Sequence, residues 1–245
     1  MHATDRRLSG YRALSFDCYG TLIDWESGIL SALQPLLARA SATRAPDAAL
    51  QAFGRHESAQ QSATPSLLYR DVLAAVHASL AREWNVSADE DEDRRFAASI
   101  ARWQPFPDTV EALRYLKRHF RLIILSNVDR ESFSATQQLL GVEFDAVCTA
   151  QDIGSYKPDP RNFAFLLETA KRLGVAKSQL LHVAESLFHD HAPANRAGID
   201  SVWIHRRHGR EGTGATRATQ EMPGFLARFT SLGELARAHR EALAH

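Results

Sequence analysis

Two rhythms of hydrophobic positions alternate along the chain. Short apolar runs predict buried β-strands at about residues 12–17, 121–125, 144–149, 180–184 and 201–204. Between most of these runs, apolar residues recur three or four positions apart, which predicts amphipathic helices. Strands that alternate with helices are typical of a parallel, doubly wound α/β sheet. The stretch 209–224, rich in Gly, Thr and Arg, predicts a loop.

The segment between the first strand and residue 104 keeps only the helical rhythm. One stripe in this segment recurs every fourth residue and consists of Leu68, Val72, Val76 and Leu80. The acidic run at 89–93 predicts a solvated helix start, because the helix dipole favours negative charge at an N-terminus. We therefore expect residues 1–23 and 104–245 to form an α/β core domain. Residues 24–103 are expected to be a helical cap domain inserted into it.

The charge balance and the cysteine content exclude several classes of protein. The 245 residues include 29 basic and 29 acidic side chains, and this net charge of +0 gives no footprint for nucleic acid or an anionic membrane. Cys18 and Cys148 are too few for a disulfide framework. The chain has neither an apolar run that could span a membrane nor the apolar stretch of a signal peptide. We expect a soluble, cytoplasmic protein that acts on a small molecule.

Four strand ends carry polar side chains. These are Asp17, Ser126, Asn127, Lys157, Glu185 and Asp190. In open α/β sheets, ligands bind beyond the carboxyl ends of the strands, so these side chains are expected to meet at one edge. A carboxylate at the end of a strand, as Asp17 is, can act as a covalent nucleophile that water later releases.

Residues 17–22 read Asp-Cys-Tyr-Gly-Thr-Leu, and this motif resembles the haloacid dehalogenase superfamily. Within the superfamily it is similar to the L-2-haloacid dehalogenase branch, whereas the phosphatases have a second aspartate where this chain has Tyr19. That second carboxylate protonates the leaving group of a phosphate ester. Tyr19 cannot readily do so near neutral pH, because the ordinary pKa of tyrosine is about 10. A halide needs no proton, so Tyr19 favours carbon–halogen chemistry.

The resemblance implies a two-step hydrolysis with a covalent intermediate. Asp17 would attack C2 of a short 2-haloalkanoic acid and form an aspartyl ester, which water would hydrolyse to the 2-hydroxy acid. Thr21 matches the residue that hydrogen-bonds the nucleophile. Lys157 matches the lysine that keeps the nucleophile ionised, and Asp190 matches the acid that helps activate the water.

The resemblance also implies which residues bind the substrate. Ser126 would bind the carboxylate, Asn127 would help cradle the halide, and Tyr19 would line the pocket. The family uses a cap arginine for halide abstraction, and the best match is Arg55, with Arg39 and Arg44 as competitors. His189 stands where the family has an aromatic residue before the last aspartate. It would line the pocket and titrate near neutral pH.

Two further departures lie in the half of the site that handles water. Phe163 replaces a tyrosine of the family, so that one hydroxyl is missing. The polar stretch before the last aspartate is replaced by Ala184-Glu185-Ser186, with one extra residue before Asp190. Ser186 is the candidate that would supply the lost hydroxyl.

Glu185 keeps a second reaction open. Glu185 and Asp190 have the spacing at which phosphatases of the superfamily hold Mg²⁺, and Asp17 would be the third acid of such a site. An ion pair between Glu185 and Lys157 is the structural alternative. The leading expectation is a dehalogenase without a cofactor. The alternatives are a Mg²⁺-dependent phosphatase, a hydrolase of another activated carbon such as that of a strained-ring amino acid, and a non-catalytic binding protein. Homodimers are common among such folds.

Overall fold

A parallel β-sheet forms the centre of the protein. The computed structural model describes residues 8–219 and 221–244. Its strands are β1 (Ala13–Phe16), β2 (Arg121–Ser126), β3 (Ala146–Thr149), β4 (Leu180–Ala184), β5 (Asp200–Ile204) and β6 (Ala227–Phe229). In the described part of the chain they form one sheet in the order β3-β2-β1-β4-β5-β6, and every neighbouring pair is parallel. The structure confirms the doubly wound α/β fold and adds β6, which the sequence did not predict.

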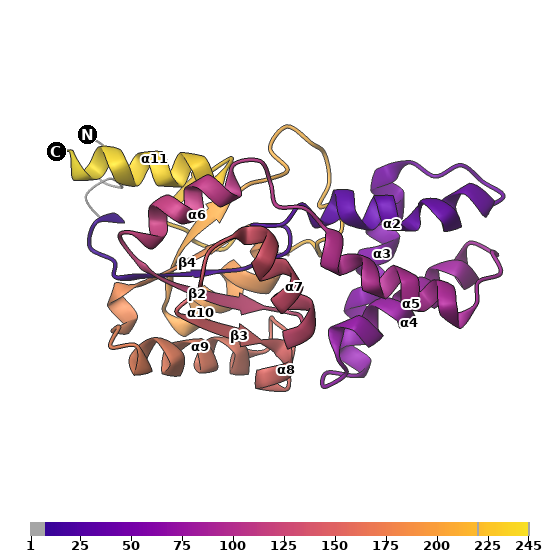
Figure 1. The fold of residues 1–245 in the computed structure, drawn as a ribbon, viewed down its shortest axis with the longest axis horizontal. Coiled ribbons are helices and arrows are strands. Elements are labelled where there is room, and N and C mark those ends of the chain that lie inside the picture. Colours follow the sequence, from indigo (N-terminus) through magenta and orange to yellow (C-terminus); the bar gives the residue numbers. More distant parts are fainter. Residues whose placement is uncertain (1–7, 220, 245) are drawn as a thin grey trace.

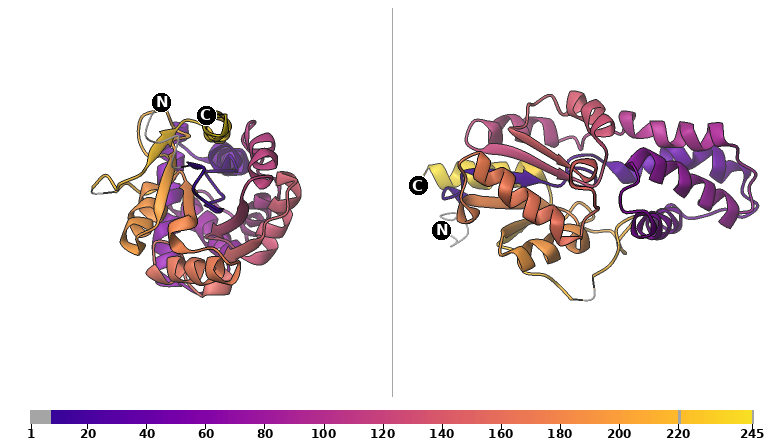
Figure 2. Two further views of the ribbon diagram at one scale, coloured as in Figure 1. Left: turned by 90° about the vertical axis from the view of Figure 1, so that its left-hand side faces the viewer. Right: turned by 90° about the horizontal axis from the view of Figure 1, so that it is seen from below.

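Helices cover both faces of the sheet, as Figures 1 and 2 show. On one face, α6 (Thr109–Lys117), α7 (Arg130–Leu140) and α11 (Leu232–Leu243) share an apolar cluster with Leu14 and Phe16 of β1. On the other face, α9 (Pro160–Arg172) and α10 (Ala192–Ala197) share a second cluster with Ala13. Successive side chains of β1 therefore point to opposite faces, as the pleat of a strand requires.

A separate group of helices lies beyond one end of the sheet (Figure 1). It consists of α2 (Trp25–Arg39), α3 (Pro46–Ala63), α4 (Tyr69–Glu83), α5 (Glu90–Ala98) and the 3-10 turn Ser99–Arg102. These elements occupy the segment in which we expect the cap. The chain enters and leaves this group side by side, because Asp24 donates a backbone hydrogen bond to Gln104 at 2.9 Å.

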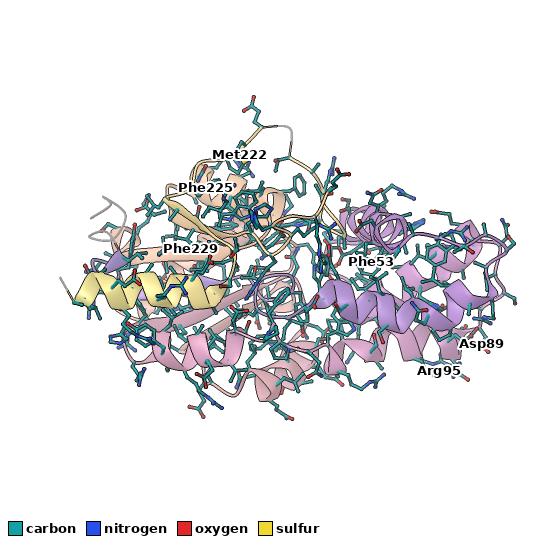
Figure 3. All side chains as sticks on the ribbon, turned by 90° about the horizontal axis from the view of Figure 1, so that it is seen from above. Phe53, Asp89, Arg95, Met222, Phe225 and Phe229 are labelled. Carbon is teal, nitrogen blue, oxygen red and sulfur yellow. The ribbon has the colours of Figure 1, made fainter. Side chains whose placement is uncertain are left out.

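The helical group has its own apolar interior and a solvated far end. Phe53 packs between Trp25 and Phe96, with ring centroids 6.1 and 6.3 Å away. Figure 3 shows Phe53 inside the group and Asp89 at its far end. The Asp89 carboxylate accepts a hydrogen bond from the backbone of Glu92 at 2.8 Å and caps α5, which confirms the solvated helix start.

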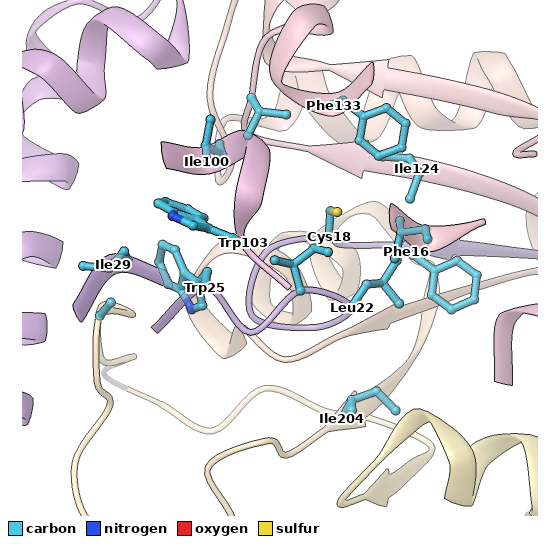
Figure 4. Close-up of a cluster of buried hydrophobic side chains, with 14 of the residues drawn as sticks. Phe16, Cys18, Leu22, Trp25, Ile29, Ile100, Trp103, Ile124, Phe133 and Ile204 are labelled. Atoms are coloured by element: carbon cyan, nitrogen blue, oxygen red, sulfur yellow. The ribbon is translucent and has the colours of Figure 1, made fainter. Parts of the chain in front are cut away.

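An apolar cluster joins the helical group to the sheet. Figure 4 shows Phe16 and Leu22 near the sheet, with Trp25, Ile100 and Trp103 on the side of the helices. The packing is so close that a side chain at Gly28 would place its Cβ 2.4 Å from the Trp103 ring. None of the helices in residues 8–219 and 221–244 combines the length and the apolar composition needed to cross a membrane.

Candidate active site

Asp17 directly follows β1, at the point where the sheet changes its direction of winding. From β1 the chain proceeds through β2 and β3 on one side and through β4, β5 and β6 on the other. Crevices at such switch points are where ligands bind in open α/β folds. Thr21 donates a hydrogen bond to Asp17 Oδ2 at 2.7 Å and accepts one from the Glu185 backbone at 2.8 Å. Thr21 therefore ties the nucleophile candidate to the loop after β4.

The Lys157 ammonium lies between two buried carboxylates. Its Nζ is 2.9 Å from Asp17 Oδ1, 2.7 Å from Asp190 Oδ1 and 3.1 Å from the Leu125 carbonyl oxygen. These three bonds use all three donors of the ammonium. The alternative ion pair between Lys157 and Glu185 does not occur in the structure, because both carboxylate partners of Lys157 are already in place.

The three charges set one another's protonation. Burial raises the pKa of Asp17, Lys157 counteracts this rise, and the neighbouring Asp190 adds to it. Burial would also raise the pKa of Asp190, but Lys157 and His182 hold it well below its ordinary value. Burial would lower the pKa of Lys157, yet the two carboxylates raise it above that of a free lysine. Lys157 therefore stays cationic and can keep Asp17 ionised.

Asp190 is held by a histidine that the sequence did not single out as part of the site. His182 Nε2 lies 2.9 Å from Asp190 Oδ1, and the other ring nitrogen lies 2.9 Å from Ser15 Oγ. Asp190 Oδ2 is buried and has no hydrogen-bond partner within the described residues. This oxygen can accept a proton or a hydrogen bond from a small molecule in the pocket. The extra residue before Asp190 is accommodated by a π-helical turn, Leu187–His191, a geometry that often marks functional sites.

The same pocket is lined by Ser126, Asn127 and Tyr19, whose side chains differ in their hydrogen bonds. Ser126 Oγ is buried and has no partner among the residues that the structure describes, so it is free to bind a ligand. The Asn127 amide instead holds the backbone of Lys157, accepting from its N–H at 2.6 Å and donating to its carbonyl at 3.1 Å. The Tyr19 hydroxyl is 2.6 Å from Thr136 Oγ1.

His189 lines the pocket as expected, but the expectation that it titrates near neutral pH is wrong. Burial lowers the pKa of His189 to about 4, so the ring is neutral at pH 7. Its Nδ1 lies 3.1 Å from Ser186 Oγ, which also accepts the His189 backbone N–H at 3.0 Å. Ser186 therefore brings its hydroxyl to the pocket wall and fixes the His189 ring.

Arg55 does not reach this pocket, in contrast to the expectation from the sequence. Its side chain is 63% exposed and pairs with Glu83 at 3.3 Å. The reason is its position on α3, where Glu57 and Gln61 face the pocket. Arg55 precedes Glu57 by two residues, which is about 200° around a helix. Arg55 instead lines a separate outer cavity of about 510 Å³. Arg39, a competitor, binds Glu92 at 2.7 Å, and Arg44 stacks on Trp84.

The side of the pocket opposite the sheet consists of four residues that the sequence analysis missed. We call them the cap wall: Trp25, Glu57, Gln61 and Tyr69. A signal for two of them exists in the sequence. The apolar stripe of α3 runs through Leu50 and Phe53 and then turns polar at Glu57 and Gln61, although all four are buried. A polar residue in a buried stripe is a candidate for binding.

A loop from the far end of the chain closes the pocket. Thr216 lines it, and the preceding residue packs so tightly on α3 that a Cβ at Gly54 would lie 2.2 Å from the Ala215 carbonyl oxygen. The Ala215 backbone N–H donates to Glu26 at 3.1 Å. We call residues 212–217 the strap. The cavity is about 40 Å³, far below the 300–1,000 Å³ of pockets for drug-sized ligands, so it suits a very small substrate.

Comparison with known proteins places this site in a family. A family model described as haloacid dehalogenase-like hydrolase matches residues 11–198. The chain belongs to the haloacid dehalogenase-like hydrolases. This finding confirms the resemblance drawn from residues 17–22, and it makes the protein a hydrolase.

Relatives of this hydrolase include dehalogenases and phosphatases. (S)-2-haloacid dehalogenase 4A of Burkholderia cepacia is 28% identical over 204 residues, which cover 80% of this chain and 84% of that protein. Phosphoglycolate phosphatase of Mesorhizobium japonicum is 28% identical and covers 77% and 80%. The L-2-haloacid dehalogenase of Xanthobacter autotrophicus, solved with chloropropionic acid covalently bound, is 21% identical and superposes with a TM-score of 0.77 over 94% of this chain and 98% of that one. At this identity, the superposition shows a shared fold.

The donor atoms of this family member do not fit a Mg²⁺ ion bound by Asp17, Glu185 and Asp190. The Lys157 ammonium lies between two of these carboxylates. Glu185 lines a different cavity, beside Glu26 and Arg207. Burial and the nearby Glu26 raise the pKa of Glu185 to about 8, so it is mainly protonated at neutral pH. Among residues 8–219 and 221–244 there is no group of three side chains that could hold a metal ion.

Phe163 does not stand at the pocket in this family member. It is buried, and its ring packs edge to face on His182 with centroids 5.3 Å apart. The hydroxyl that the family carries here has no counterpart on this side chain. Phe163 instead supports the histidine that orients Asp190.

Proposed function

We propose that the protein hydrolyses a small 2-haloalkanoic acid through an ester of Asp17. The observation that carries this proposal is the state of Tyr19, two residues after the nucleophile. Burial raises the pKa of Tyr19 well above its ordinary value, and its hydroxyl is engaged with Thr136 at 2.6 Å. Because the residue at that position cannot protonate a leaving group, the site favours a leaving group that needs no proton from Tyr19, as halide does.

In the first step, an oxygen of Asp17 attacks C2 and the halide departs with the electron pair of the carbon–halogen bond. Lys157 and Thr21 hold the Asp17 carboxylate at 2.9 and 2.7 Å, which fixes its direction of attack. The free Ser126 hydroxyl is placed to donate a hydrogen bond to the carboxylate of the substrate.

In the second step, water attacks the carbonyl carbon of the Asp17 ester. Asp190 Oδ2 is the candidate base, because it is buried in the pocket and has no other partner among the described residues. Lys157 and Thr21 already point at the Asp17 oxygens, so they can stabilise the oxyanion that forms. Collapse of this intermediate returns the Asp17 carboxylate and releases the 2-hydroxy acid.

The names of several relatives support a haloacid substrate, since (S)-2-haloacid dehalogenase 4A and haloacetate dehalogenase H-2 of Moraxella sp. are 28% and 25% identical to this chain. Displacement at another activated carbon, such as that of a strained-ring amino acid, would use the same Asp17 ester. The cap wall favours keeping this second candidate, because it offers Glu57 where a halide-binding arginine was expected.

The test measures halide release from L-2-chloropropionate with EDTA present. Turnover in ¹⁸O-labelled water should place the label in the Asp17 peptide, and Asp17→Asn should be inactive. If chloro-, bromo- and fluoroacetate all remain intact while EDTA-sensitive hydrolysis of p-nitrophenyl phosphate occurs, the protein is a phosphatase and the proposal is wrong.

A further inference from the structure

The cap wall combines one acid with aromatic rings. Glu57 is only 5% exposed, and Trp25 and Tyr69 line the pocket with it. A carboxylate beside aromatic residues can bind an ammonium group, which gains from the opposite charge and, over a ring face, from the ring quadrupole. Such a wall is ill suited to a halide ion, which is itself an anion.

Two polar groups of the cap wall have capacity left for a ligand. The only hydrogen bond of Glu57 within the described residues comes from the Tyr69 hydroxyl, at 2.6 Å to Oε1. Gln61, which is 7% exposed, has no side-chain hydrogen-bond partner in the same part of the chain. Because Gln61 has no partner among the described residues and Glu57 has only one, both side chains can still bind a ligand in the cavity that they line.

The charge of the whole pocket leads to the same conclusion. Asp17 and Asp190 carry two negative charges, Lys157 carries one positive charge, and His189 is neutral, which leaves one negative charge before Glu57 is counted. A substrate that brings only a carboxylate would add a second negative charge to a buried site, at a high cost in free energy. A substrate that also carries an ammonium group would not.

The protonation of Glu57 suits this role. Burial raises the pKa of Glu57 to about 7, although the Tyr69 hydrogen bond lowers it. In the empty pocket, partial protonation of Glu57 therefore limits the free-energy cost of burying its negative charge. A cation that enters the pocket favours the ionised form and displaces the proton.

We propose that the cap wall, centred on Glu57, binds a substrate ammonium group, so that the preferred substrates are small 2-haloacids with an amino group next to the reacting carbon. This inference rests on the proposed attack by Asp17 and narrows its substrate class. The chemical step is unchanged: an Asp17 oxygen bonds to C2, the halide leaves with the electron pair, and the ammonium group keeps its protons. Glu57 acts in binding and takes no part in bond formation.

Two substrates of equal size distinguish the effect of the ammonium charge on kcat/KM from the effect of substrate shape. In 3-amino-2-chloropropanoate an ammonium group stands where 2-chlorobutanoate has a methyl group, and both carry the same chlorine and carboxylate. We expect kcat/KM to be at least about tenfold higher for the amino compound, as a charged hydrogen bond implies. Glu57→Gln should bring the ratio close to one. Tyr69→Phe should retain a preference, since the carboxylate remains. An equal or higher kcat/KM for 2-chlorobutanoate in the unmodified protein would overturn the inference.

Binding of the two products separates this inference from the proposed reaction. Calorimetry on the unmodified protein would compare 3-amino-2-hydroxypropanoate with 2-hydroxybutanoate, with no turnover involved. Tighter binding of 3-amino-2-hydroxypropanoate that is lost in Glu57→Gln would support the ammonium subsite. This conclusion would hold even if neither chloro acid is hydrolysed, because the lack of hydrolysis would reject only the dehalogenase reaction. Hydrolysis of both chloro acids without any preference in binding would reject the subsite and leave the reaction standing.

Discussion

His182 Nε2 lies 2.9 Å from Asp190 Oδ1, and both side chains are fully buried. The ring cannot turn away, because its other nitrogen lies 2.9 Å from Ser15 Oγ and it packs at a steep angle against the Phe163 ring. His182 is thus a positioning residue for the carboxylate that we assign to water activation. In the proposed reaction, hydrolysis of the Asp17 ester would depend on His182 more than formation of the ester would.

His182→Phe should therefore slow the second chemical step selectively. The ring volume is kept, while the hydrogen bonds to Asp190 and Ser15 are lost, at a stability cost of about 1–3 kcal/mol. We expect kcat to fall about tenfold or more and the Asp17 ester to accumulate during turnover, which intact-protein mass spectrometry detects. Phe163→Leu is the control, since it loosens the packing but keeps the hydrogen bond and should not accumulate ester. A slower His182→Phe enzyme without accumulated ester would contradict the assignment.

Lys157→Met tests the electrostatic centre of the site. The substitution leaves the buried carboxylates of Asp17 and Asp190 without their cation, a change that typically costs about 3–5 kcal/mol. Because the pKa of Asp190 is depressed in the folded protein, its stabilising contribution is present above pH 4 and is lost as the pH falls. The deficit of Lys157→Met in urea unfolding should therefore be largest at neutral pH and shrink in acid.

The exposed Lys171 supplies the matched control for this experiment. Lys171→Met also removes one positive charge, but from the surface, and should change the free energy of unfolding by less than about 0.5 kcal/mol. Equal effects of the two substitutions at every pH would show that Lys157 contributes only as a surface charge does.

The position of Asp17 was predictable because it depends on local sequence and on a topological rule. Asp17 follows an apolar run, and parallel strands bring Lys157 and Asp190 to the same edge. The face of α3 that meets the pocket was not predicted, because the resemblance pointed to a cap arginine, whereas the pocket is lined by Glu57 and Gln61 of the buried stripe. The strap was equally hidden, since its contacts join residues far apart in sequence.

Two short elements were missed for a different reason. β6 consists only of Ala227–Phe229 and is incompletely buried, so the sequence contains no apolar run that would predict it. The π-helical turn Leu187–His191 follows from one extra residue, and the sequence showed the extra residue without showing how the chain accommodates it. Secondary structure of three to five residues is decided by its neighbours more than by its own sequence.

Glu185→Gln should flatten the pH dependence of stability. The pKa of Glu185 is about 8 in the folded protein against an ordinary value of 4.5, because burial and the neighbouring Glu26 disfavour its charge. Between these two values the unfolded chain releases a proton that the folded protein retains, so the free energy of unfolding falls as pH rises. Through Glu185, the free energy of unfolding changes by up to about 1.4 kcal/mol per pH unit. The neutral amide in Glu185→Gln does not titrate, so this pH dependence should disappear.

The measurement is urea unfolding of both proteins at several pH values from 5 to 8. Glu234→Gln is a useful control, because the pKa of Glu234 is lowered, mainly by a hydrogen bond from the Thr230 backbone. The contribution of Glu234 to the free energy of unfolding is complete above the ordinary pKa of glutamate. Its loss should therefore shift the curve of unfolding free energy against pH without changing the slope between pH 5 and 8. Parallel curves for the unmodified protein and Glu185→Gln would show that Glu185 is ionised in the folded state.

Gly54→Ala tests whether the strap holds the pocket closed. Within a helix, replacing Gly by Ala ordinarily stabilises a protein by up to about 1 kcal/mol. Here the new Cβ would lie 2.2 Å from the Ala215 carbonyl oxygen, a backbone atom that can only move if the strap moves. We expect destabilisation by about 1–3 kcal/mol in urea unfolding and a higher KM, because Thr216 leaves the pocket wall with its neighbour. Ser58→Ala, one turn later on α3, should leave both values nearly unchanged. A more stable Gly54→Ala protein with an unchanged KM would mean that the strap yields freely and does not shape the pocket.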